Sequence, residues 1–212
     1  PNGIKDRMSL NNTLIVAPHF FPCFQYLTKA QAYPLLLIDD VGSFVKQTYQ
    51  NRAYISGANK VQRLTVPLKH GKTKQVFRDI KIDYQDNWPR KLWTAIASSY
   101  GKTPYFPFYI HKVEQLLKAR YQYLLDLNWH STTLLAEALG VNLECQWLSE
   151  KTVVSEESDD FRGFIHPRKP WYLDEQFQPV TYPQAFAERF GFLPNLSGLD
   201  LLFNQGPQGQ AI

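Results

Sequence analysis

The feature that most constrains the fold is a strand–helix–strand pattern between residues 13 and 40. "TLIVA" (13–17) and "PLLLIDD" (34–40) are short apolar runs typical of buried strands. "CFQYLTKAQA" lies between them, directly after Pro22, and has helical spacing. Two strands joined by a helix within so short a stretch form a right-handed βαβ unit. The sequence therefore predicts an α/β fold, with a mostly parallel sheet and helices on its faces.

Polar side chains follow both of these expected strands. His19 comes after the first strand, and Asp39 and Asp40 end the second. Ligands of open α/β sheets bind at the carboxyl ends of the strands, so we expect these three residues to be catalytic. The histidine would act as a general base or donate to a developing anion, and an acid would orient a nucleophile or bind a metal. The alternative is structural, with the histidine bonded to a carbonyl group and an aspartate capping the next turn.

The stretch "FVKQTYQNRAYI" (44–55) follows the acids and combines strand-forming residues with long polar ones. A strand here would place Lys46, Thr48, Gln50 and Arg52 on one face, whereas a helix would turn Arg52 away from the others. The strand is favoured. Its two cations would bind an anionic group such as a phosphate or carboxylate. The alternatives are an exposed sheet face, or an ion pair between Arg52 and one of the acids.

The rest of the chain predicts a hairpin, several helices and a polar break. Residues 61–68 and 76–83 alternate in polarity and are expected to pair with each other. Helical spacing follows in 87–102, 107–128, 130–142, 183–191 and 195–206. We expect Ser131 to cap the third of these helices and Gly140 to end it. Asn195 or Ser197 should cap the last helix, and Gly206 should end it. We expect an α/β domain over 8–148, an acidic loop or linker over 149–163, and a helical C-terminal segment over 164–212 that packs back on the same domain.

Composition narrows the class of protein. The chain has 212 residues with 44% hydrophobic content and a net charge of +4, which suits one globular domain and permits an anionic ligand. Cys23 and Cys145 fit neither a zinc site nor a disulfide framework. No apolar run is long enough to span a bilayer, so a soluble cytoplasmic protein is expected. The sequence has no phosphate-binding glycine loop, metal motif or other cofactor signature, and it leaves the cofactor unknown and an oligomer open.

A run of basic residues raises nucleic acid as a partner. The run comprises Lys60, Arg63, Lys69, His70, Lys72, Lys74, Arg78 and Lys81. Lysines also collect at solvated hairpin tips and protect edge strands. The solvated interpretation is favoured, and nucleic acid is the weakest of the partners considered.

Seven stretches resemble the WbqC-like protein family in the same order along the chain. They are "APHFFPCFQYL", "FVKQTYQNRAYISGAN", "RLTVPLKHG", "IDYQDNW", "SSYGKTPYF", "LDLN" and "GFLPNLSGLDLLFNQGP", and the resemblance runs from Leu14 to Pro207. Its most specific parts are K-x-x-x-x-N-R and N-L-S-x-x-D-L-L-F-N. These single out Lys46, Asn51 and Arg52, with Asn195 and Asp200, as expected substrate-binding residues.

The resemblance implies a role in surface-polysaccharide (O-antigen) biosynthesis. That role suggests a cytoplasmic step on an activated sugar or a linked small acid. We therefore expect a transferase of polysaccharide or amino-sugar metabolism that acts on a small anionic substrate, either a sugar nucleotide or an acyl donor. The alternative is a non-catalytic binding or scaffold protein of a polysaccharide assembly complex. A nucleic-acid-binding protein is a weaker third hypothesis.

Overall fold

The βαβ unit at the start of the chain is confirmed. A computed structural model describes residues 13–69, 75–150 and 158–211. Strand β1 (Thr13–Val16) leads through helix α1 (Phe24–Ala32) to strand β2 (Leu35–Ile38). The two strands are parallel, with Leu14 opposite Leu36. Successive residues of each strand point to opposite faces and both sets are buried, so both faces of the sheet are covered.

Two further strands complete a parallel four-stranded sheet. Its order is β5-β2-β1-β6, where β5 is Cys145–Trp147 and β6 is Ser158–Asp160. The expected α/β fold with a mostly parallel sheet is therefore confirmed. The end of the acidic segment, expected to be a loop, is a strand instead, because the open edge of β1 supplies its backbone partners. Residues 151–157 of that segment lie outside the described residues.

The expected hairpin has a different partner. Strand β4 (Lys60–Thr65) pairs with β3 (Arg52–Gly57) and not with residues 76–83. A tight turn at residues 58–59 joins β3 to β4, and closing so short a loop costs little chain entropy. Residues 76–83 hold a short 3₁₀ helix, η1 (Phe77–Asp79), and meet the chain after β4 only through an isolated bridge between Leu68 and Ile82.

Most of the stretch 44–55 is not a strand. Residues 46–51 form turns and a bend, and strand β3 begins only at Arg52. Gln50 Oε1 accepts from the Val45 backbone N–H at 2.7 Å, and Thr48 Oγ1 donates to the Val45 carbonyl at 2.8 Å. These side-chain contacts close a compact loop in place of a strand ladder. The expectation that Lys46, Thr48, Gln50 and Arg52 share one strand face is therefore wrong.

The central helices are α2 (Trp88–Tyr100), α3 (Phe106–Lys118) and α4 (Leu124–Leu139). The single helix expected over 107–128 is broken between α3 and α4. Arg120 there has a φ of 54°, and the Ile82 N–H bonds the Gln122 carbonyl at 3.0 Å, which holds this stretch extended. Ser131 is not a cap, because it lies inside α4. Gly140 ends that helix in the left-handed conformation, as expected, with a φ of 72°.

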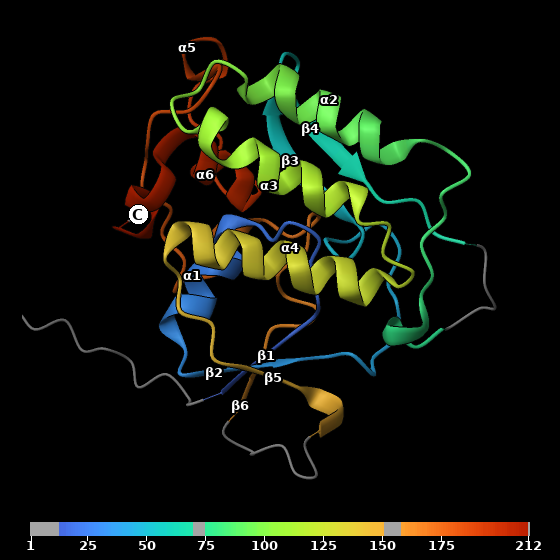
Figure 1. Ribbon diagram of the computed structural model, residues 1–212. Coiled ribbons are helices and arrows are strands. Elements are labelled where there is room, and N and C mark those ends of the chain that lie inside the picture. Colours follow the sequence, from blue (N-terminus) through green and yellow to red (C-terminus); the bar gives the residue numbers. More distant parts are fainter. Residues whose placement is uncertain (1–12, 70–74, 151–157, 212) are drawn as a thin grey trace, which may run out of the picture.

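The C-terminal segment packs back on the sheet domain, as predicted. It contains the short helix α5 (Ala187–Phe190) and the longer α6 (Gly198–Gln205), which Ser197 caps and Gly206 ends. Three 3₁₀ turns complete the chain: η2 (Leu148–Glu150), η3 (Trp171–Leu173) and η4 (Gly206–Ala211). Figure 1 shows α6 beside α1 and α4, above the parallel sheet.

One buried core unites these parts. It includes Leu14, Leu36, Leu27, Ile55, Leu64, Ile96, Leu135, Leu199, Leu202 and Phe203. The strands, the hairpin and helices from both ends of the chain all contribute to it. None of the helices in the described ranges is both long and apolar enough to cross a membrane.

Candidate functional site

The carboxyl edge of the parallel sheet contains a topological switch point. The chain leaves β1 for β2 on one side, whereas β6 lies on the other side of β1. The gap between the ends of β1 and β6 is where open α/β sheets bind ligands. His19 follows β1 and Arg162 follows β6, so these two residues flank the switch point.

A charge network links the ends of β2 and β6 across this edge. Arg162 donates to Asp39 Oδ2 at 3.0 Å and to Asp160 Oδ2 at 2.6 Å. The Arg162 side chain is 41% exposed, whereas that of Asp39 is 9% exposed. A guanidinium has five N–H groups, so Arg162 retains donors beyond those that face the two acids. The network fixes the Arg162 guanidinium between two carboxylates at this edge.

Asp40 has a different environment from Asp39. Its Oδ1 accepts from the Ser149 backbone N–H at 3.0 Å, and its Oδ2 accepts from Ser149 Oγ at 2.6 Å. Asp40 thereby ties the end of β2 to the turn that follows β5. Among the described residues, no group of three His, Cys, Asp or Glu side chains could hold a metal ion.

His19 is buried at the edge of the core. Its ring lies against the rings of Tyr26 and Tyr49, at centroid distances of 4.7 and 5.2 Å. Burial, followed by the nearby His166, lowers the pKa of His19 to about 3, so the ring is neutral at pH 7. Its Nδ1 is buried and has no hydrogen-bond partner in the described part of the chain.

His166 is the second histidine of this region, and its side chain is partly exposed. Its Nδ1 accepts from the Arg168 backbone N–H at 3.0 Å. Burial lowers the pKa of His166, and the charges of Arg168 and Lys169 lower it further. A neutral ring with an occupied Nδ1 carries its proton on Nε2. His166 can therefore donate from Nε2 to an anion that develops beside it.

Three of the residues expected to bind substrate lie in the loop before β3 or at the first residue of that strand. Lys46 is exposed on the loop before β3, and the neighbouring Gln47 accepts from Arg168 of the loop after β6. Asn51 donates to the Val66 carbonyl at 3.0 Å and so closes the open end of the hairpin. Arg52 begins β3, and its Nε is buried without a hydrogen-bond partner in the described ranges.

The C-terminal motif holds helices in place. Asn195 Oδ1 accepts from the Gln25 backbone N–H at 2.9 Å, in the first turn of α1, where α1 has no side-chain cap of its own. Asp200 is fully buried and accepts from Tyr100 and Tyr182 hydroxyls and from Gln184 Nε2, at 2.7, 2.8 and 2.9 Å. Burial raises the pKa of Asp200 to about 6. These contacts give both residues a structural part, and their expected part in substrate binding stays a prediction.

Sequence reasoning missed Arg162 and His166. Their place at the switch point depends on β6, and Ser158–Asp160 is polar and carries no strand pattern. A weak signal exists in the alternation of charged and aromatic residues after Asp160, in "FRGFIHPRK".

Most of the chain is similar to one family of known proteins. The family model described as "WbqC-like protein family" matches residues 17–164. The uncharacterized protein Rv1507c of Mycobacterium tuberculosis is 26% identical over 227 aligned positions, covering 94% of this chain and 96% of that protein. The name of that protein assigns it no reaction. No solved structure matches the chain.

Proposed function

Because the chain belongs to the WbqC-like protein family, we propose that it is a transferase of surface-polysaccharide or amino-sugar biosynthesis. Its substrate would be a small anionic activated molecule, either a sugar nucleotide or an acyl donor, and the step would take place in the cytoplasm. The single observation that carries the proposal is the bonded pair of Asp39 and Arg162 at the carboxyl ends of β2 and β6. Buried His19 follows β1 at the same sheet edge and lies close enough to His166 for that residue to lower its pKa.

Each residue has a distinct part in the proposed site. Arg162 binds the anionic group of the substrate, because it is partly exposed and has N–H groups to spare. Asp39 positions Arg162 and is the candidate base. His166 donates from Nε2 to the charge that develops in the transition state. His19 is buried and neutral, and its proposed part is to pack beside His166.

A substrate panel tests the proposal. Sugar nucleotides and acyl donors would be titrated by calorimetry, and mixtures of donor and acceptor would be followed by mass spectrometry. His166→Asn keeps an acceptor for the Arg168 N–H but removes the Nε2 donor. We expect this variant to bind within about twofold of the wild type and to lose about 100-fold in turnover. Arg162→Lys should weaken binding about tenfold, because lysine lacks the guanidinium fork.

His111→Asn is the matched control, because His111 is an exposed histidine on α3, away from the sheet edge. It should match the wild type in binding and in turnover. Wild-type turnover in His166→Asn, or the absence of any ligand in the panel, would remove the catalytic site from this edge.

The scaffold hypothesis is supported by one observation. Tyr172 and Leu173 are adjacent in η3 and are 66% and 58% exposed, which is unusual for large apolar side chains. A scaffold protein would use such a surface and would show neither turnover nor dependence on Arg162. The substrate panel therefore separates the two hypotheses.

A further inference from the structure

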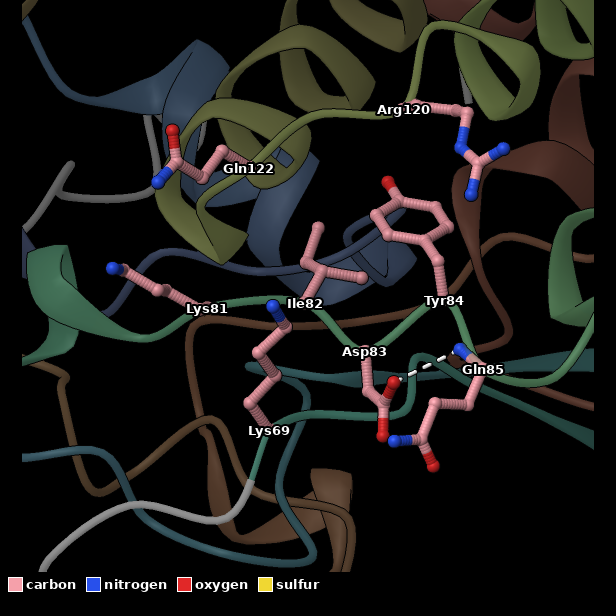
Figure 2. Close-up of a pocket in the computed structure, with 8 residues that line it drawn as sticks. All are labelled: Lys69, Lys81, Ile82, Asp83, Tyr84, Gln85, Arg120 and Gln122. Atoms are coloured by element: carbon pink, nitrogen blue, oxygen red, sulfur yellow. Dashed lines mark hydrogen bonds between the residues drawn. The ribbon is translucent and has the colours of Figure 1, made fainter.

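Outside the switch point, a pocket lies on a small backbone ladder formed by residues 67–69, 81–83 and 122. Its volume is about 840 Å³, and it is lined by Lys69, Lys81, Ile82, Asp83, Tyr84, Gln85, Arg120 and Gln122. Three chain segments form its floor through the bonds Lys69 N–H to Lys81 carbonyl, Ile82 N–H to Gln122 carbonyl and Asp83 N–H to Pro67 carbonyl, at 2.9, 3.0 and 2.9 Å. Figure 2 shows the eight lining side chains, with Ile82 and Tyr84 on one side of their segment and Asp83 and Gln85 on the other.

The cations of this pocket are not neutralised by ion pairs. Within residues 13–69, 75–150 and 158–211, the ion pairs involve other cations, such as Lys118 with Glu114 and Lys91 with Asp86. Lys69, Lys81 and Arg120 face the pocket together with a single acid, Asp83. Three positive charges beside one negative charge make this pocket attractive to an anion.

Arg120 is held in a conformation that brings it to the pocket. Its φ of 54° is left-handed, which arginine rarely adopts. Its guanidinium lies over the Tyr84 ring, 5.0 Å from the centroid. Figure 2 places Arg120 beside Tyr84 and the two lysines on the other side of Ile82. The positive charge is therefore spread along the pocket and is not concentrated at one point.

The remaining lining residues indicate what else the ligand carries. Gln85 and Gln122 offer amide donors and acceptors, and Asp83 offers an acceptor, so the pocket suits hydroxyl groups. Tyr84 is not free to stack on a base, because Arg120 and Trp88 already contact its ring. Its hydroxyl donates to the Tyr121 carbonyl. We infer that this pocket binds a sugar phosphate, and that it prefers one with phosphates at both ends.

Calorimetric titration of the full chain tests the inference, with a hexose 1,6-bisphosphate, the hexose 1-phosphate and the free hexose as probes. The bisphosphate should bind most tightly and the free hexose should not bind. Arg120→Asn removes the cation and leaves a residue that tolerates the left-handed backbone. This variant should weaken bisphosphate binding about tenfold. Lys81→Gln should weaken it to a similar extent.

Lys60→Asn is the matched control. Lys60 is also an exposed cation with positive φ, at 82°, but it lies at the tip of the β3–β4 hairpin. It should bind the bisphosphate within about twofold of the wild type. Equal weakening by Lys60→Asn would reduce the effect to net charge and overturn the inference. If the wild type does not bind the bisphosphate, the inference is also overturned.

Single-stranded polyuridylate is the competing probe, since a phosphate backbone offers the same anionic chemistry. Tighter binding of polyuridylate than of the bisphosphate, with a steep loss as salt rises, would assign the pocket to nucleic acid and overturn the inference. The switch-point variant Arg162→Lys should not change bisphosphate binding. The inference about this pocket and the proposal of a transferase site can therefore be refuted independently.

Discussion

At the scale of single residues, the C-terminal motif is explained by buried polar contacts. Asp200 is shared by two tyrosine hydroxyls and one amide, and Asn195 caps a helix that begins far away in the sequence. A motif that stands out in a sequence need not bind a ligand, because a buried polar group that must find hydrogen-bond partners also constrains its neighbours strongly. Both residues can be tested by stability measurements.

Asp200→Asn should reduce the free energy of unfolding by about 1–3 kcal/mol near pH 7, because the Asn Nδ2 cannot accept from Tyr182 or Gln184. The deficit should depend on pH. The folded-state pKa of about 6 exceeds the unfolded value of 3.8, so the folded wild type binds the proton more tightly. This adds about 3 kcal/mol below pH 4, which is lost as the pH rises through 6.

Urea unfolding of the wild type and Asp200→Asn between pH 4 and 7 measures this difference. Other groups titrate equally in both proteins and cancel. The deficit should be largest near pH 4 and should shrink toward pH 7. A deficit that stays constant across this range would contradict the raised pKa.

Asn195 has a φ of 57° and caps α1, so Asn195→Ala should lose both the cap and a residue suited to that backbone. We expect a loss of about 1–2 kcal/mol in urea unfolding. Asn195→Gly is the matched variant, because glycine keeps the backbone conformation and removes only the cap. It should lose less than Asn195→Ala. Wild-type stability in both variants would show that the cap does not stabilise the fold.

At the scale of elements, α1 is joined to the C-terminal segment by a buried ion pair. Lys29 Nζ lies 2.9 Å from Asp174 Oδ1, and both side chains are 3% exposed. Gln25 of the same helix donates to Asp174 Oδ2 at 2.8 Å. The helix that connects β1 to β2 therefore also anchors the chain that follows β6.

Lys29→Met should destabilise the protein by about 3–5 kcal/mol, because it leaves the Asp174 carboxylate buried without its cation. Lys118→Met removes an exposed partner of Glu114 and is the control. It should change the free energy of unfolding by less than about 0.5 kcal/mol. Thermal and urea unfolding of both variants measure the contrast. If both variants lower the free energy of unfolding by a similarly small amount, then Lys29 is not essential to the contact between α1 and the C-terminal segment.

The elements also show where sequence reasoning succeeds. The β1–α1–β2 unit was predictable because its signals are local: two apolar runs, a helical spacing and a break at Pro22. Strand β6 was not, because its partner β1 lies far away in sequence and its own residues are polar. The hairpin could have been found from the short turn at "GANK" (57–60).

In the candidate site, too, local sequence signals were sufficient for some residues, and others depend on contacts that are distant in sequence. His19 and Asp39 were placed at the correct sheet edge by the βαβ argument alone. Lys46 and Arg52 were expected to share one face of a strand. The structure has a loop there, closed by the contacts of Gln50 and Thr48 with Val45. Arg162 enters the site only through β6, so no local pattern could assign it.

At the scale of the whole molecule, the region that defines the family is smaller than the region that builds the core. The family model covers residues 17–164, which excludes β1 and α6. Leu14, Leu199, Leu202 and Phe203 lie outside that range and are each 0% exposed. We therefore propose that residues after 164 belong to the same cooperative unit as the sheet and are not an appended lobe.

Deletion of residues 195–212 tests this proposal, because it removes α6, its buried leucines and phenylalanine, and the Asn195 cap of α1. The surfaces of α1 and α4 that α6 covers would then be exposed to water. The Tyr100 hydroxyl would also lose its hydrogen-bond acceptor, Asp200. We expect the shortened chain to lose cooperative thermal unfolding and near-ultraviolet circular dichroism. If it instead unfolds in one sharp transition, with native-like spectra and wild-type switch-point binding, then α6 is an accessory to a sheet domain that folds without it.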